Sequence, residues 1–421
     1  MTVKPAVSGA NQQSGKRNVI NFLTKNSMTI ALVLVFVLFY FLTNKRLLLP
    51  QNMSNLLLQN GYVLVLACGM LLCILTGGNI DLSVGSVICL TGGLAAVLIN
   101  NNGWNPYITI VLCLLAGLAV GVWQGYWIGY VRIPPFITTL AGMFIFRGIG
   151  RLVLDSKTVP IKDTAFTSLF TSYINIPGLD VVSTKANPVD NPHIWSPLII
   201  GGIIVIAVIA MTVRNRLNRK KNNYTMNSAL MDYGKTAVIG ALVMWYCWKL
   251  SQYKGISVML VWVLAICLIY YFITSKTVVG RYFYAVGGNE KATKLSGIDT
   301  NRIYFLAYTN LGFLAGLCGL LCLARVGSVS GATGTSFEMA AIASCFIGGA
   351  SAYGGSGTVG GVSASGGAGS ILGMVIGATL IGMINLGMFQ ISLDANYQRV
   401  VKGFVLLAAV VFDILSKKKQ S

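Results

Sequence analysis

The sequence predicts an all-α protein, a polytopic bundle of transmembrane helices with about 10–12 spans. Of its 421 residues, 55% are hydrophobic and only 10% are charged, and the mean hydropathy is +0.72. An ordinary soluble domain carries about 25% charged residues. The basic residues behind the net charge of +20 gather between long apolar runs. Such basic loops indicate membrane topology beside anionic lipid, so we expect no nucleic-acid partner.

The apolar runs can be placed in order along the chain. Residues 1–27 are polar and the next run lacks a cleavage site, which indicates a cytoplasmic tail and a retained first helix. Short runs at 236–250 and 338–350 can be half-helices held by protein neighbours. We expect one transmembrane domain over 28–415, then a basic cytoplasmic tail, 416–421. The candidate spans are 28–43, 55–76, 82–99, 107–130, 136–154, 197–213, 236–250, 257–274, 303–325, 338–350, 369–388 and 398–415.

Positive charges assign the loops to sides of the membrane. With the first tail inside, the basic segments 214–221, 275–302 and 416–421 fall on the same side. The long loop 155–196 falls outside, with three lysines against four aspartates. Twelve crossings with both termini in the cytoplasm satisfy the positive-inside rule, with Lys45 and Arg46 as the exception.

The polar stretch 275–302 contains a very short candidate helix. Asn289 can cap its start, and Glu290 places a carboxylate in the first turn. Gly297 can take the left-handed position that ends a helix. A helix of roughly seven residues is about 10 Å long and is too short to be stable alone in water.

The faces of this short helix differ in character. Ala292 and Leu295 share one face, and Lys291 and Lys294 share another. One interpretation is that a partner docks on the apolar face and orders the helix. The alternative is a solvated loop between two membrane spans.

Two glycine-dense stretches, 76–86 and 347–361 with an extension to Gly369, stand between apolar runs. Glycine this dense allows broken helices that line a cavity, although small residues that simply pack neighbouring helices are an equal alternative. Asp81 can cap a helix that starts at Leu82. Alternatively, its carboxylate can lie on a path through the membrane or at the end of the bundle where a partner docks.

Two further charges, Glu338 and Arg147, are costly in lipid and should face protein or water. The nine cysteines all lie in apolar runs and indicate small buried hydrophobes, not disulfides or metal ligands. The only histidine, His193, has no Cys or Glu cluster beside it. The chain has no Walker A, HExxH or nucleophile-elbow pattern. We therefore expect no catalytic residue, metal or cofactor.

The segment GRYFYAVGGNEKATKLSGI, residues 280–298, resembles the cytoplasmic coupling motif of bacterial sugar ABC-importer permeases of the ribose, xylose and galactoside type. TGGNIDLSVGS at 76–86 and IPPFITTLAGMFIFRG at 133–148 resemble the same family, and matching blocks run from about 55 to 413. The chain departs from the family in Lys291-Ala292-Thr293, where an acid and two alanines are usual, and in 363–370, which lengthens the glycine loop.

The resemblance implies that 275–302 is a cytoplasmic coupling loop, in which a Gly-Gly-Asn turn precedes a short helix on the ATPase. Gly288 would need a positive φ in such a turn. The residues that the resemblance assigns to ATPase coupling are Gly287, Gly288, Asn289, Glu290, Lys291, Ala292, Leu295 and Gly297. The candidate residues of the translocation path are Asn79, Asp81, Ser83, Phe136 and Glu338.

The family further implies a permease subunit with the fold of the vitamin B12-type (type II) importers, in the bacterial cytoplasmic (inner) membrane. It would form a homodimer in lipid, with a cytoplasmic ABC ATPase subunit and an extracytoplasmic sugar-binding protein as partners. The sugar would enter the cytoplasm while the ATPase hydrolyses ATP. The 212–256 region resembles an insertion of the longer xylose and multiple-monosaccharide permeases, with a basic cytoplasmic loop and an extra apolar span.

Three alternatives remain open. Within the family, the cargo can be a nucleoside or a signalling furanose in place of a monosaccharide. A proton-coupled sugar symporter needs acids inside the membrane, for which the chain offers only Asp81 and Glu338. A membrane-embedded transferase needs a polar catalytic cluster at an interface, and the sequence contains none.

Overall fold

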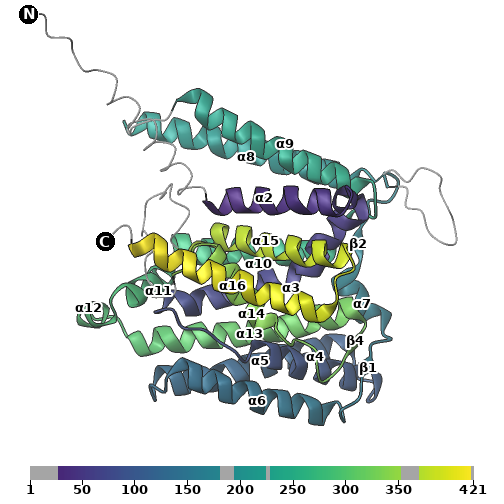
Figure 1. Ribbon diagram of the computed structural model, residues 1–421, viewed down its shortest axis with the longest axis vertical. Coiled ribbons are helices and arrows are strands. Elements are labelled where there is room, and N and C mark those ends of the chain that lie inside the picture. The colour runs from purple at the N-terminus through teal and green to yellow at the C-terminus, as the bar shows by residue number, and fades with distance from the viewer. Residues whose placement is uncertain (1–26, 181–193, 224–227, 352–368, 419–421) are drawn as a thin grey trace, which may run out of the picture.

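The computed structural model describes residues 27–180, 194–223, 228–351 and 369–418. Its long helices lie side by side with roughly parallel axes (Figure 1). Every one of the predicted apolar runs falls on a helix, as expected for a polytopic bundle. The long helices are α2 (Ser27–Leu42), α3 (Pro50–Leu75), α4 (Val84–Asn100), α5 (Pro106–Gly129), α6 (Pro135–Val153), α8 (Ser196–Lys221), α9 (Ala229–Ser251), α10 (Val258–Lys276), α13 (Thr300–Val326), α15 (Ile371–Gln390) and α16 (Ala395–Lys418).

Short elements connect these helices. The strands form two antiparallel pairs, β1 with β4 and β2 with β3. The short helices are η1 (Arg46–Leu48), α7 (Thr164–Thr171), α11 (Val278–Gly288), α12 (Glu290–Leu295) and α14 (Phe337–Ile347), and the strands are β1 (Val159–Pro160), β2 (Tyr173–Ile174), β3 (Ile256–Ser257) and β4 (Ser328–Val329). Helix α12 and the end of α16 lie at one end of the bundle, and α7 and the strands lie at the other (Figure 1).

Seven helices in the described part of the chain are long and apolar enough to cross a membrane: α3, α5, α6, α8, α10, α13 and α15. Their presence confirms the all-α, multi-pass architecture. Helices α3 and α13 form the centre, because 78% of the most apolar stretch of each is buried, against 17% in α8. Proline at the first position starts α3, α5 and α6, where the missing N–H leaves no helical bond unmade.

The two short apolar runs belong to helices of very different length. The run 236–250 belongs to α9, whose 23 residues extend about 34 Å at 1.5 Å per residue. The run 338–350 belongs to α14, whose 11 residues extend only about 16 Å. A hydrocarbon core is about 30 Å thick, so α14 is too short to cross it and has the length of a half-helix. Helix α9 has the length to cross, but it is not among the seven helices that are also apolar enough.

Helices α8 and α9 form a hairpin at the edge of the bundle (Figure 1). Arg216 forms an ion pair with Asp232 across the hairpin at 3.0 Å. The Tyr246 hydroxyl ties α9 to the bundle by donating to the Met53 carbonyl at 3.0 Å. The 212–256 region therefore forms the last part of α8 and the whole of α9.

A stripe of glycines brings α5 against α13. A Cβ added at Gly121 would lie 2.7 Å from the carbonyl oxygens of Tyr308 and Thr309. A Cβ added at Gly312 would lie 2.6 Å from the Gly117 carbonyl oxygen. The backbones of these helices thus approach as closely as glycine allows, which is how small residues pack helices in membranes.

Candidate functional site

A break separates α3 from α4. The chain leaves α3 after Leu75 and enters α4 only at Val84. Gly77 and Gly78 have φ of 130° and 77°, a region that residues with a Cβ rarely adopt. The first glycine-dense stretch is therefore a break between two helices.

The second glycine-dense stretch follows the half-helix α14. Gly349 has a φ of 89° just after the helix ends. A Cβ added at Gly348 would lie 2.5 Å from the carbonyl carbon of Gly373, so α14 and α15 meet backbone to backbone. Most of the stretch, and of the 363–370 insertion, lies outside the described residues.

Asp81 is buried in the α3–α4 break and holds the chain just before α4. Its Oδ1 accepts the Ser83 backbone N–H and the Ser83 hydroxyl, both at 2.7 Å. The Ser83 hydroxyl in turn accepts the Gln124 side-chain amide at 2.6 Å. The expected helix start at Leu82 is wrong, because α4 begins at Val84 and its N-cap residue is Ser83. Asp81 forms a local side-chain-to-backbone turn ahead of the cap position.

Glu338 lies in the first turn of α14, next to the start of α4. A Cβ added at Gly85 would lie 2.6 Å from Glu338 Oε2. A helix N-terminus favours a carboxylate, because unpaired N–H groups give it partial positive charge. Arg147 faces protein, as its cost in lipid predicts, and donates to the Thr333 carbonyl at 2.5 Å. The N-terminal ends of α4 and α14 therefore converge around polar groups.

The five predicted path residues do not form one cluster. Asp81 and Ser83 are bonded to each other, and Glu338 lies beside Gly85 of α4. Asn79 turns back to α3 and donates to the Thr76 hydroxyl at 3.2 Å. Phe136 lies apart in the first turn of α6, with 55% of its surface exposed.

We expect Asp81→Asn to retain near-normal uptake, because an amide oxygen can still accept the Ser83 N–H. Asp81→Ala leaves that buried N–H unpaired and should lose about 1–3 kcal/mol of stability. Sugar uptake and thermal unfolding of both variants test this. If Asp81→Asn fails in uptake at a normal membrane level, the charge itself takes part in transport.

The short helix α12 has the end signals that the sequence predicts. Asn289 is its N-cap, and Asn289 Oδ1 accepts the Ala292 N–H at 2.9 Å. Glu290 is the acid of the first turn. Gly297 has a φ of 81°, the left-handed conformation expected after the helix.

The Gly-Gly turn expected before α12 is wrong. Gly287 and Gly288 are the last two residues of helix α11, where φ is negative. The chain turns at Asn289, which is extended at φ −161° and ψ 100°. Gly288 does not have a positive φ, so its backbone conformation does not require a glycine.

Within the residues that the structure describes, one face of α12 is held by the protein and the rest of the helix is exposed. Thr293 is buried, and its hydroxyl donates to the Ala285 carbonyl of α11 at 2.8 Å. Ala292 is exposed, and Leu295 is 90% exposed. Lys291 and Lys294 are exposed as well.

Arg132, in the turn between α5 and α6, anchors the start of α12. Its Nη1 lies 2.7 Å from Glu290 Oε1. It also donates to the Thr300 hydroxyl at 2.8 Å and to the Asn301 side chain. Its guanidinium lies 5.0 Å from the centre of the Tyr304 ring. Arg132 thereby links the α5–α6 turn, the start of α12 and the start of α13 at the same end of the bundle.

Glu290 is ionised at neutral pH. Partial burial raises the pKa of Glu290, but the hydrogen bond and charge of Arg132 outweigh this, with smaller help from Tyr304 and Thr300, and the pKa lies below its ordinary value. The two side chains are 38% and 37% exposed. An ion pair this exposed is worth roughly 0–1 kcal/mol, so it orients α12 more than it stabilises the fold.

Sequence reasoning missed Arg132, Tyr304 and Gln124. Arg132 carries a weak signal, since a single arginine before Pro134 and Pro135 lies at the end of a predicted span. Gln124 carries another, as a side-chain amide inside an apolar run. Neither signal identifies the residue that the side chain contacts, because that residue is distant in the sequence.

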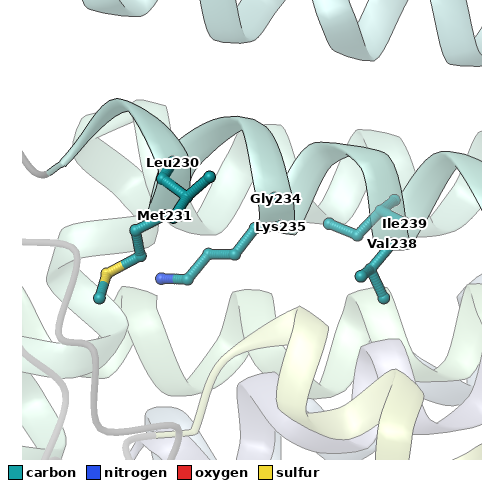
Figure 2. Close-up of a pocket in the computed structure, with 6 residues that line it drawn as sticks. All are labelled: Leu230, Met231, Gly234, Lys235, Val238 and Ile239. Atoms are coloured by element: carbon teal, nitrogen blue, oxygen red, sulfur yellow. The ribbon is translucent and has the colours of Figure 1, made fainter.

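A pocket of about 480 Å³ lies beside the first half of α9 (Figure 2). Among the described residues, those that line it all belong to α9, with Lys235 among apolar side chains. None of the predicted site residues borders it. Its lining is Leu230, Met231, Gly234, Lys235, Val238 and Ile239.

Comparison with known proteins finds a matching family and several similar proteins. A family described as "Branched-chain amino acid transport system / permease component" matches residues 52–410. The chain is 34% identical to the xylose transport system permease protein of Haemophilus influenzae over 393 residues, which cover 93% of this chain and 96% of the relative.

Two other relatives have similar coverage. The xylose transport system permease protein of Escherichia coli is 32% identical, over 93% of this chain and 92% of its own. The ribose import permease protein of Escherichia coli is 30% identical, over 88% and 87%. No solved structure matches the chain.

Proposed function

Because the chain belongs to this family of permease components and is a sugar ABC-importer permease, we propose that it imports a monosaccharide. Among the sugar permeases it resembles the xylose permeases most. It is a multi-pass membrane protein of the permease type. In the proposal it is the membrane-spanning subunit of a binding-protein-dependent importer. A separate subunit hydrolyses the ATP, and this chain catalyses no reaction.

The exposed face of α12 carries this proposal. Leu295 lies on a helix of six residues and is 90% exposed, so it gains almost no burial from the described part of this chain. The same helix is attached to the rest of the protein on its other side through Thr293 and Glu290. A short helix presented in this way suits a groove on another protein, where apolar side chains become buried. The proposed partner in that groove is the ABC ATPase.

We further assign the remaining partners to the two ends of the bundle. The ATPase end, with α12 and the end of α16, is assigned to the cytoplasm, and the end with α7 to the outside. A sugar-binding protein then docks at the α7 end. Both termini are assigned to the cytoplasm, and the permease acts as a homodimer in the bacterial inner membrane.

The proposed path for the sugar passes the break before α4 and the start of α14. Asp81, Ser83 and Glu338 lie at these converging helix ends. Irregular backbone at membrane depth is tolerated where it is buried in protein or lines a cavity. A nucleoside or a signalling furanose is the alternative cargo, with ring hydroxyls of the same chemistry.

Reconstituted uptake tests the function. Proteoliposomes with permease, ATPase and binding protein should accumulate labelled D-xylose only with ATP, and a protonophore should not stop them. The purified permease alone should hydrolyse no ATP. Uptake that collapses with the proton gradient at constant ATP would favour a symporter in place of the importer.

A further inference from the structure

The Tyr304 hydroxyl lies between α12, the helix proposed to face the ATPase, and the break between α3 and α4. It is 3.1 Å from Glu290 Oε2 of α12 and 3.1 Å from the Thr76 carbonyl oxygen at the end of α3. A phenol has one proton to donate, and both of these groups are acceptors. The hydroxyl must therefore share its hydrogen bond between them or choose one.

Thr76 is the point where α3 gives way to the break. Its carbonyl group belongs to the residue that caps α3, directly before the positive φ of Gly77 and Gly78. The Asn79 amide contacts the Thr76 hydroxyl at 3.2 Å and the Thr76 carbonyl at 3.4 Å. A change at this carbonyl therefore acts on the segment that leads to Asp81.

Arg132 fixes the geometry of the shared donor. Its guanidinium lies 5.0 Å from the centre of the Tyr304 ring while its Nη1 holds Glu290 at 2.7 Å. Arg132 itself has a φ of 65°, which only surrounding contacts can sustain in a residue with a long side chain. Tyr304 is buried, so its ring cannot swing away to water.

We propose that Tyr304 is a positioning residue that couples the movement of α12 to the break between α3 and α4. When the ATPase pulls Glu290 away from α13, the hydroxyl gives its whole hydrogen bond to Thr76. When Glu290 returns, the bond at Thr76 weakens and the break is released. The inference rests on the proposed docking of the ATPase on α12.

Hydrogen exchange of the complete permease, with and without the ATPase that co-purifies with it, tests this coupling. In the wild type, the ATPase should protect 290–297 and slow exchange at 76–83 by up to about tenfold, the effect of one neutral hydrogen bond that strengthens at the Thr76 carbonyl. In Tyr304→Phe, protection at 290–297 should remain and the change at 76–83 should fall below about twofold.

Tyr246→Phe is the matched control, because it also removes one hydroxyl that donates to a carbonyl, Met53, at the edge of the bundle. It should respond as the wild type does. A response at 76–83 that is equal in Tyr304→Phe and wild type, or absent from both, overturns the coupling. A wild type without protection at 290–297 overturns instead the docking of the ATPase on α12.

Discussion

Ala292→Arg is expected to abolish uptake and to release the ATPase, while the permease reaches the membrane at its normal level. Ala292 is exposed in this chain, so an arginine there meets no clash before docking. In the docked complex the same side chain would lie in an apolar contact beside Leu295. Burying an unpaired charge there costs several kcal/mol, enough to reduce binding by at least about a hundredfold.

Lys294→Ala is the control on the other face of α12. An exposed charge contributes roughly 0–1 kcal/mol, so uptake and co-purification should change little. Affinity purification of tagged permease, with quantification of the bound ATPase, measures both variants. If Lys294→Ala releases the ATPase and Ala292→Arg retains it, the docking face is the opposite one.

Gly121→Ala is expected to destabilise the folded permease by about 3 kcal/mol or more, at the top of the 1–3 kcal/mol that overpacking of a core usually costs. The new Cβ would meet two backbone carbonyl oxygens of α13 at 2.7 Å, and backbone atoms cannot turn aside as side chains do. Helix α13 would have to move away from α5 along its length. Membrane level and the midpoint of thermal aggregation in detergent should both fall.

Gly148→Ala is the matched control on α6, since a Cβ added there has no atom within 4 Å. Alanine favours a helix over glycine by about 1 kcal/mol, so this variant should be neutral or slightly stabilised. A Gly121→Ala permease as stable as Gly148→Ala would contradict the close backbone contact between α5 and α13.

What the sequence determined by itself is local. The apolar runs predicted the helices correctly, because a helix satisfies its backbone hydrogen bonds within each run in a medium without water. The ends of α12 were also correct, because Asn289 and Gly297 act within three or four residues of their own position. The helix start expected at Leu82 and the turn expected at Gly288 were wrong by two residues or fewer, in places where several nearby residues can end a helix.

Only the tertiary structure decided which distant groups meet. Arg132 and Glu290 are 158 residues apart in the chain, and Tyr304 and Thr76 are 228 apart. No periodicity or spacing reports such pairs, because they depend on how α5, α13 and α3 pack. The packing depends in turn on the glycines of α5 and α13, which let the backbones approach until side chains at the helix ends come within hydrogen-bond distance.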